Sequence, residues 1–503
     1  MTKTKSLAVA SLLLLGALPA AAAPAVVTLS FDDTFADQLQ VGPLLAARGL
    51  HATFFVNSPR IDQDGYMTND QLLSLQAAGN EIAGHTANHM ALSTIPADEQ
   101  RRQICDDRVA LLGRGFNVAN FAYPHGAGDL ATHQIVTDCG YNAARDLASL
   151  RSHDPETCSP CAYAETMPPQ DALSIRTPVS VKSNITLADL QLSVTDAEAH
   201  GGGWVPFVFH HVCDGCNTLA ISPAVLTQFL DWLAARSGTT GTTVKTFQDV
   251  IAGPLNAGVP GPAPTQFVDT DGNLLRNASL ETDADGDLVP DCWQLSPGGA
   301  GAASYTAGRA SEAHSGTGAE LITVTGMPAS SPRIVTFQDL GYCAPVATSG
   351  HTYKLSAWYQ ASGPAVLLAY YRTSTGAWKY WTKSPALPAS AAYVLGEWTT
   401  PALPADAKGL SVGIALTTAG TLAADDLRLT DTAGPPVTPP DTTGADAGAP
   451  SGDNPDLGSS TPPPTMTDNG GCAFVAGAQG QVYLAAALLG LLLLAAAPRR
   501  RRR

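Results

Sequence analysis

Two segments rich in proline and glycine divide the chain and so limit what it can fold into. Residues 253–266 read GPLNAGVPGPAPTQ, and residues 433–468 combine Pro, Gly, Asp and Thr with almost no bulky apolar side chains. Such compositions cannot bury a core, so we expect both segments to be linkers. The chain of 503 residues therefore contains two candidate folded domains, residues 24–252 and residues 267–432.

The two candidate domains have different hydrophobic patterns. In the first, short apolar runs such as residues 26–31 and 52–56 alternate with helical segments such as residues 96–112. This alternation predicts an α/β fold with a mostly parallel sheet or barrel, in which functional residues gather at the C-terminal ends of strands. The second domain contains short β-rich runs separated by Gly, Pro and Ser, a pattern that predicts an all-β antiparallel sandwich.

The N-terminal segment has the composition of an export signal. Lys3 and Lys5 precede a short apolar run at residues 7–18, and small residues follow it. This order predicts a secretory signal peptide over residues 1–23, because the apolar run is too short for a membrane span.

The C-terminal segment, residues 469–503, has three parts. Cys472 precedes an apolar run at residues 482–497, and five arginines at residues 499–503 close the chain. This order resembles the bacterial three-part sorting tails, especially the myxobacterial type with a Cys before the apolar helix. The resemblance implies transient membrane insertion, cleavage by a sorting protease, and delivery to the cell surface at the outer membrane or release from the cell. A permanent inner-membrane anchor, with the arginines on the cytoplasmic side, is the alternative.

The acidic balance of the chain excludes one class of partner. There are 28 Lys and Arg against 44 Asp and Glu, which gives a net charge of −16. Seven of the basic residues lie in the two terminal segments, and without them the net charge is −23. Such a surface repels phosphate, so we expect no binding to nucleic acid and poor binding to acidic lipid.

Cysteine usage agrees with export. The chain has nine cysteines, and eight remain when Cys472 of the tail is set aside. An even number in an exported protein predicts disulfides. A four-thiolate zinc site made from the two C-x-x-C pairs is the alternative. The favoured pairs are Cys105–Cys139, Cys158–Cys161, Cys213–Cys216 and Cys292–Cys343.

Polar residues that suit a metal site follow two of the predicted strands. Asp32 and Asp33 come directly after residues 26–31, and adjacent carboxylates repel each other unless a cation binds. His85 and His89 follow another predicted strand, and the i, i+4 spacing places both rings on one face if the segment is helical. One carboxylate and two imidazoles suit a divalent metal with an open position for water. A solvated Asp-Asp turn and two surface histidines are the alternative.

Two further motifs complete the pattern. Residues 121–126 read FAYPHG, and residues 207–211 read FVFHH, so a histidine at the end of a strand is available as a general acid. Each motif alone has an ordinary structural interpretation as a turn or a core residue. Four such motifs in this order, each after a strand, favour a catalytic site.

The order S-F-D-D, H-T-x-x-H, F-A-Y-P-x-G and F-x-F-H resembles the polysaccharide deacetylases (NodB-like, carbohydrate esterase family four) over roughly residues 26–251. The resemblance implies a distorted (β/α) barrel with one divalent ion, for which zinc is expected. It implies that Asp32 is the general base and that Asp33, His85 and His89 are the metal ligands.

The same resemblance implies how the remaining motifs would act. Water made more acidic by the cation would attack an acetamide carbonyl. The metal and the backbone N–H of His125 would hold the oxyanion, in a pocket that also includes Tyr123 and Pro124. His210 would protonate the leaving amine, which gives acetate and a free amino sugar.

Three positions depart from the family pattern or leave it open. Many relatives have an Arg where Ala122 stands, and that Arg pairs with the catalytic Asp; we expect Arg176 to replace it from another strand. His125 occupies the position of a family aromatic. The doublet of His210 and His211 leaves the general acid open, although strand alternation admits only one of them and the family pattern favours His210.

The second domain opens with residues that resemble carbohydrate-binding jelly rolls, namely residues 277–281 (NASLE) and 290–293 (PDCW). The resemblance implies a jelly-roll-like sandwich that binds carbohydrate. Strand aromatics such as Trp358 and Tyr380 suit sugar stacking, although strand aromatics more often form a core. Alternating acids between the two motifs suit a structural Ca²⁺ ion or, equally, a solvated turn. These acids are Asp283, Asp285, Asp287 and Asp291.

Together these features predict an exported, metal-dependent enzyme that removes N-acetyl groups from a polysaccharide of N-acetylated amino sugars, such as a chitin-, peptidoglycan- or exopolysaccharide-like polymer. The sandwich would hold the enzyme near its polymer. One alternative is an O-acetyl esterase acting on a polysaccharide such as xylan. The other is a non-catalytic glycan-binding protein of the cell surface.

Overall fold

The computed structural model describes residues 23–153, 158, 160–284, 286–296, 305–326 and 332–434. Nearly all of the expected signal peptide, the linker beyond residue 434, the C-terminal tail and Asp285 lie outside these residues. Within the described ranges, none of the helices combines the length and the apolar character needed to cross a bilayer.

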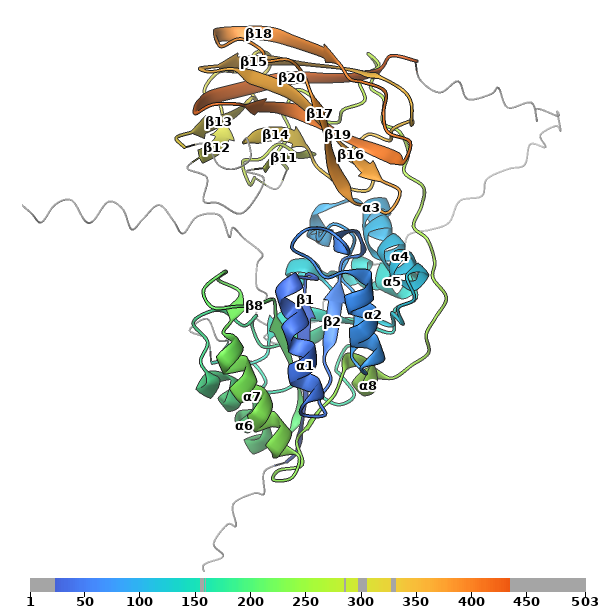
Figure 1. Cartoon of the computed structure of the whole chain (residues 1–503), viewed down its shortest axis with the longest axis vertical. Coiled ribbons are helices and arrows are strands. Elements are labelled where there is room, and N and C mark those ends of the chain that lie inside the picture. The colour runs from blue at the N-terminus through green and yellow to red at the C-terminus, as the bar shows by residue number, and fades with distance from the viewer. Residues whose placement is uncertain are drawn as a thin grey trace, which may run out of the picture.

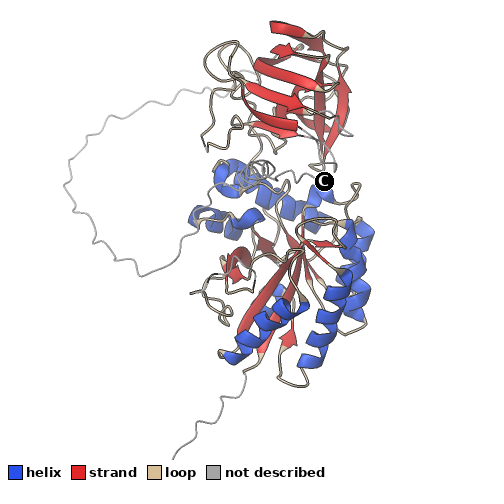
Figure 2. Cartoon of the chain, turned by 90° about the vertical axis from the view of Figure 1, so that its left-hand side faces the viewer, coloured by secondary structure: helices blue, strands red, loops and turns tan. Residues whose placement is uncertain are grey.

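The first domain is a nearly closed barrel of parallel strands with helices around it (Figures 1 and 2). The hydrogen-bonded order is β7-β1-β2-β3-β4-β5-β6, and β10 extends the β2 edge of β1 at its N-terminal end. No ladder joins β6 to β7 in the described part of the chain, so the barrel opens there. The strands are β1 (Ala25–Asp32), β2 (Thr53–Val56), β3 (Glu81–Gly84), β4 (Asn120–Ala122), β5 (Ala143–Ser149), β6 (Ile175–Thr177), β7 (Gly203–Phe209) and β10 (Thr243–Val244), with a separate pair β8 (His211–Val212) and β9 (Ala220–Ile221).

Helices and short turns connect these strands. Thr68, Thr186 and Thr246 each begin a helix with a capping box, and Pro223 occupies the first turn of α7. The α-helices are α1 (Val41–Ala46), α2 (Asn69–Ala77), α3 (Ala97–Arg101), α4 (Asp107–Gly113), α5 (Leu130–Asp138), α6 (Leu187–Ala199), α7 (Pro223–Arg236) and α8 (Phe247–Ile251). A π-helical turn, η4 (Arg102–Asp106), joins α3 to α4, and the 3-10 helices are η1 (Ala36–Gln40), η2 (Ser58–Arg60), η3 (Leu92–Thr94) and η5 (Pro124–Gly126).

The barrel core explains why the first strand is almost wholly apolar. Val27, Leu29 and Phe31 of β1 are buried on one face, while Thr28 and Ser30 are buried on the other. A parallel strand that is covered on both faces has no solvent-facing positions, so its sequence does not alternate between apolar and charged residues. The strand-and-helix alternation of the sequence therefore predicted the barrel correctly.

The second domain consists of two antiparallel five-stranded sheets, as the β-rich pattern predicted. Side chains from both sheets, such as Tyr359, Leu367, Ile414 and Leu429, form its core. One sheet has the order β11 (Trp293–Ser296), β14 (Arg333–Thr336), β19 (Ala407–Leu416), β16 (Ala365–Thr373) and β17 (Trp378–Lys383). The other has the order β12 (Tyr305–Arg309), β13 (Glu320–Val324), β20 (Gly420–Asp431), β15 (Tyr353–Ala361) and β18 (Ser390–Thr399).

All four expected disulfides are present. Cys105 is bonded to Cys139, Cys158 to Cys161, Cys213 to Cys216, and Cys292 to Cys343. Each C-x-x-C pair closes on itself, so the alternative of a shared four-thiolate zinc site is wrong.

The sandwich lies against the end of the barrel that carries α3 (Figures 1 and 2). The backbone N–H of Leu340 donates to Glu99 Oε1 at 2.8 Å. In the turn between β16 and β17, Gly376 lies so close to Pro59 that a Cβ added to it would be 3.1 Å from the proline Cγ.

The linker between the domains is bound to the barrel surface. Arg108 donates to the carbonyls of Asn256 and Ala257 at 2.8 and 2.9 Å, and the N–H of Gly261 donates to Asp106 Oδ1 at 2.8 Å. The Pro/Gly segment therefore helps to fix the sandwich on the barrel.

Candidate active site

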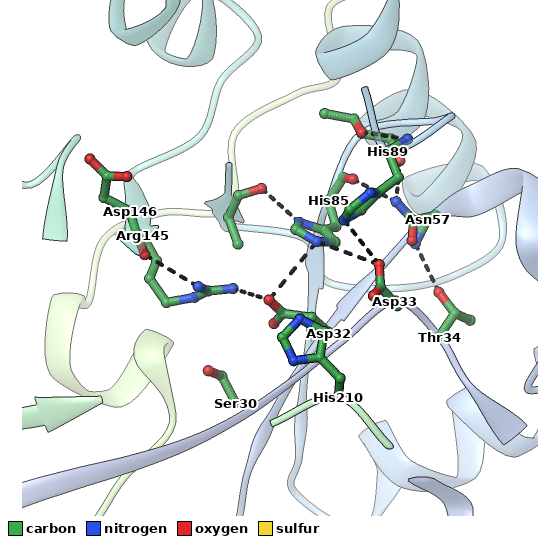
Figure 3. A network of polar contacts seen from close by, with 12 residues as sticks. Ser30, Asp32, Asp33, Thr34, Asn57, His85, His89, Arg145, Asp146 and His210 are labelled. Atoms are coloured by element: carbon green, nitrogen blue, oxygen red, sulfur yellow. Dashed lines mark hydrogen bonds and ion pairs between the residues drawn. The ribbon is translucent and has the colours of Figure 1, made fainter. Parts of the chain in front are cut away.

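The motifs that the sequence singled out meet at the C-terminal ends of the barrel strands (Figure 3). Asp32 is the last residue of β1, His85 follows β3 and His210 follows β7. Parallel strands end at the same edge of a sheet, so residues far apart in the sequence converge there.

Asp33, His85 and His89 form a candidate metal centre. Asp33 Oδ1 lies 3.1 Å from His89 Nε2 and 3.8 Å from His85 Nε2, and one ligand atom from each residue lies within 4.8 Å of the others. The segment that carries the two histidines is not helical, so the shared helical face that their spacing would allow is not what brings the rings together. Thr86 and His89 have φ of 63° and 57°, so a tight irregular bend brings the two rings together.

The electrostatics of this set suit a divalent cation. Burial lowers the pKa of His85 and of His89 to about 3, so both rings are neutral at neutral pH. His85 Nδ1 lies 2.8 Å from the carbonyl of Ala122, which directs its Nε2 toward Asp33. Burial alone would raise the pKa of Asp33, but His89, His85 and Arg60 together hold it well below its usual range. One carboxylate and two neutral imidazoles fit such an ion.

Asp32 lies beside this set and is held by an arginine. One terminal nitrogen of Arg145 contacts Asp32 Oδ2 at 2.5 Å, and the guanidinium lies 4.8 Å from the centre of the Phe55 ring. Arg145 is 1% exposed. Asp32 Oδ2 also lies 3.9 Å from His85 Nε2, and its Oδ1 is buried and has no hydrogen-bond partner among the residues that the structure describes. The carboxylate therefore has one oxygen fixed and one oxygen available.

The expectation that Arg176 pairs with Asp32 is wrong, because Arg145 occupies that place. Arg176 pairs with the buried carboxylate of Glu165 at 2.7 and 2.9 Å rather than with Asp32. Arg145 is the direct neighbour of Ala122 in the ladder between β4 and β5. Arg145 follows two alanines and precedes Asp146 in the sequence, so nothing in the local pattern pointed to it.

The two adjacent histidines have different surroundings. His211 Nδ1 lies 2.7 Å from Asp37 Oδ2, and its ring stacks on Phe35 with a centroid distance of 3.8 Å. His210 lies next to Asp32 (Figure 3), and within the described part of the chain its buried Nδ1 has no hydrogen-bond partner. His210 is therefore the histidine that faces the site.

The FAYPHG motif places one ring, that of His125, beside His89, while the Tyr123 ring packs on Phe121 and His133. Tyr123 is buried, and burial raises its pKa well above the usual range, so its hydroxyl stays neutral. Pro124 and His125 lie in the turn η5, where His125 has a φ of 57°. The exposed ring of His125 lies 4.6 Å from that of His89, centre to centre.

A nearly closed parallel barrel with this donor set and an adjacent carboxylate defines a candidate metal-dependent hydrolase. Residues 20–144 match the family model described as polysaccharide deacetylase, so this part of the chain is similar to that family.

Known proteins resemble the chain over part of its length. The chain is 26% identical over 118 residues to YxkH of Bacillus subtilis (strain 168), which is named provisionally as a polysaccharide deacetylase; the match covers 23% of this chain and 42% of YxkH. Among solved structures, the deacetylase PplD of Streptococcus pyogenes, in complex with acetate, is 24% identical, with 24% of this chain and 56% of PplD covered and a TM-score of 0.24. The Xyl-CE4 domain of a multidomain xylanase from the hindgut metagenome of Trinervitermes trinervoides is 16% identical, with 45% and 89% covered and a TM-score of 0.31.

The strand aromatics of the sandwich are divided between the core and the surface, and the sequence left both placements open. Tyr359 is in the core, and the His314 ring stacks on Trp358 with a centroid distance of 3.8 Å. Tyr380, by contrast, is 54% exposed.

The expected calcium ligands are engaged within their own loop. Asp283 accepts the N–H groups of Gly286 and Leu288, Asp287 accepts that of Val289, and Asp291 accepts that of Ala284. Calcium binding by this loop stays a prediction.

Proposed function

We propose that the chain is an exported, metal-dependent polysaccharide N-deacetylase that releases acetate from a polymer of N-acetylated amino sugars. The single observation that carries the proposal is the position of a second carboxylate, Asp32, beside the complete donor set of Asp33, His85 and His89. One oxygen of this buried carboxylate has no hydrogen-bond partner among the described residues, and such burial is costly. Glycan binding alone gives no reason for that cost, whereas a general base needs a free oxygen.

Each residue near the acetyl group has a distinct task. A divalent cation held by Asp33, His85 and His89, which we expect to be zinc, would supply Lewis acidity toward the acetyl carbonyl and the attacking water. Asp32 accepts a proton from that water through its free oxygen, while Arg145 neutralises its charge and fixes its orientation.

His210 acts on the leaving group. The new bond forms between the water oxygen and the carbonyl carbon, and the carbon–nitrogen bond breaks. His210 donates a proton to the nitrogen, and the products are acetate and a free amine on the sugar. Tyr123, Pro124 and His125 wall the pocket around the acetyl group.

The proposal extends to delivery and substrate capture. Four disulfides support an oxidising compartment, which agrees with a signal peptide over residues 1–23. The tail at residues 469–503 would pass the protein to a sorting protease and then to the cell surface or the medium. The sandwich, fixed on the barrel by Glu99 and the bound linker, would contact the same polymer.

The decisive experiment measures acetate release from N-acetylglucosamine oligomers, peptidoglycan and acetylated xylan. It uses purified protein of known metal content and an Asp32→Asn variant. We expect release from at least one N-acetylated polymer, loss of release after chelation, and loss in the variant. Release from xylan alone would favour the O-acetyl esterase. No release from any polymer, with glycan binding unchanged in Asp32→Asn, would favour the non-catalytic surface protein.

A further inference from the structure

A buried glutamine links the two strands that end in the catalytic base and acid. The ladder between β1 and β7 ends with the pair Phe31 and Phe209. The next residues, Asp32 and His210, lie beyond the last pair and have no partner in that ladder. Gln38 Nε2 lies between them and donates to the carbonyl of Asp32 at 2.5 Å and to that of His210 at 2.8 Å.

The backbone after Asp32 turns back to bring Gln38 to this place. Asp33 and Thr34 have φ of 79° and 68°, so the chain reverses and η1 returns across the ends of β1 and β7. The side chain of Gln38 is fully buried there. A left-handed conformation at two successive non-glycine residues is costly, and the surrounding contacts must stabilise it.

Neighbours of Gln38 hold the same segment. Asp37 accepts the N–H of Val212 at 3.2 Å and pairs with His211, while the Gln40 side chain donates to the Val212 carbonyl at 2.7 Å. Three side chains of η1 therefore hold residues 210–212, and only Gln38 also holds the strand that carries Asp32.

His210 depends on this support more than Asp32 does. Asp32 is also fixed through its side chain by Arg145, whereas no described residue forms a hydrogen bond with His210 Nδ1. The placement of the His210 ring therefore depends on its backbone. Because a misplacement of about 1 Å can cost about 100-fold in rate, this one backbone contact matters.

We propose that Gln38 is a positioning residue that sets the spacing between the general base Asp32 and the general acid His210. The proposal rests on the function proposed above. It predicts a specific defect. Hydrolysis of an amide needs a proton on the leaving nitrogen, whereas hydrolysis of an aryl acetate releases a stable phenolate that needs no proton. Loss of Gln38 should harm amide hydrolysis much more than aryl acetate hydrolysis.

The test compares Gln38→Met with Asn80→Leu. Asn80 is also buried and joins two backbone segments, through the Ala52 N–H and the Leu75 carbonyl, but at the opposite ends of β2 and β3. Both changes replace an amide with an apolar group of similar size. We expect Gln38→Met to lose about 10- to 100-fold in kcat on N-acetylglucosamine oligomers, with KM changed by less than about threefold. Its kcat on 4-nitrophenyl acetate should fall by less than about threefold.

A second readout does not depend on activity. The ring signals of His210 in NMR spectra of histidine-labelled protein should broaden in Gln38→Met and stay sharp in Asn80→Leu. Equal losses on both substrates, or an unchanged amide rate, would overturn the proposal. If Gln38→Met does not fold, Gln40→Met, which changes an exposed side chain on the same segment, should show a smaller loss with the same substrate bias. Wild-type protein that releases no acetate from any polymer refutes the proposed function, whereas the substrate bias tests Gln38 alone.

Discussion

Arg145 stands directly opposite Ala122 in the ladder between β4 and β5, and its guanidinium contacts Asp32 at 2.5 Å. The small side chain at 122 leaves the space that the long side chain of the neighbouring strand fills. The chain thus supplies a cation to the Asp32 carboxylate from the strand next to the one that carries Ala122.

This relationship predicts that Arg145→Met will lower kcat for acetate release by about 100-fold, because the buried carboxylate loses the one arginine that contacts it among the described residues. Arg145→Lys should recover part of the activity, since a lysine restores the charge but not the planar geometry. The rates are measured at matched metal content, with circular dichroism to check folding.

A double variant tests whether the cation can be supplied from β4 instead of β5. The double variant Ala122→Arg with Arg145→Ala should be more active than Arg145→Ala alone, because the cation returns from the adjacent strand. Equal activity of the two would show that Arg145 acts other than through its charge at Asp32.

The donor set predicts selective loss of metal. His85→Ala and His89→Ala should each weaken zinc binding by more than about 100-fold, since each removes one of three ligands. Bound metal is measured by elemental analysis after dialysis. His200→Ala, at the exposed residue that follows the end of α6, is the control and should bind metal like the wild type.

The adjacent histidines predict unequal effects. His210→Ala should lower acetate release by about 100- to 10,000-fold, because the leaving nitrogen loses its proton donor. His211→Ala should cost less than about tenfold, since His211 is engaged by Asp37 and Phe35. A larger loss in His211→Ala than in His210→Ala would assign the general acid to His211.

The interface between barrel and sandwich predicts a dependence of stability on pH. Burial and the neighbouring Asp339 carboxylate raise the pKa of Glu99 to about 7, above its ordinary value of 4.5. The folded state thus binds more protons than the unfolded state between these values, so the free energy of unfolding falls as pH rises from 4.5 to about 7. Two cations in the cluster, Arg102 at 2.9 Å from Glu99 and Arg372, limit the rise in the pKa of Glu99. Asp106 adds a further negative charge to the cluster.

Glu99→Gln should remove this part of the pH dependence. Between pH 5 and pH 8, the Tm should fall less for the variant than for the wild type. Each kcal/mol of pH-dependent free energy of unfolding that the variant lacks corresponds to roughly 2–4 °C in Tm. Glu397→Gln, at an exposed pair with Lys354, is the matched control and should follow the wild type. An identical fall in wild type and Glu99→Gln would contradict the prediction.

Much of the fold and of the site could be predicted from the sequence. Apolar runs such as that ending at Phe31 predicted the barrel, because a strand buried on both faces admits few polar residues. The convergence of Asp33, His85 and His89 followed from their positions after parallel strands. What failed was local: the histidine segment is an irregular bend, because Thr86 and His89 adopt a left-handed backbone that residue spacing does not reveal.

The sequence by itself determined the class of each domain, an α/β barrel and a β-sandwich, and the residues that gather at the strand ends, since these depend on periodicity and on residue type. It favoured the four cysteine pairs without excluding a zinc site, and the structure decided between them. Only the tertiary structure decided which partner each of them has. Arg145 rather than Arg176 contacts Asp32 because the register of β4 and β5 places it there. His210 rather than His211 faces the site because Asp37, from a distant part of the chain, engages the other ring. Such choices arise from contacts between segments that are far apart in the chain, and local pattern contains no information about them.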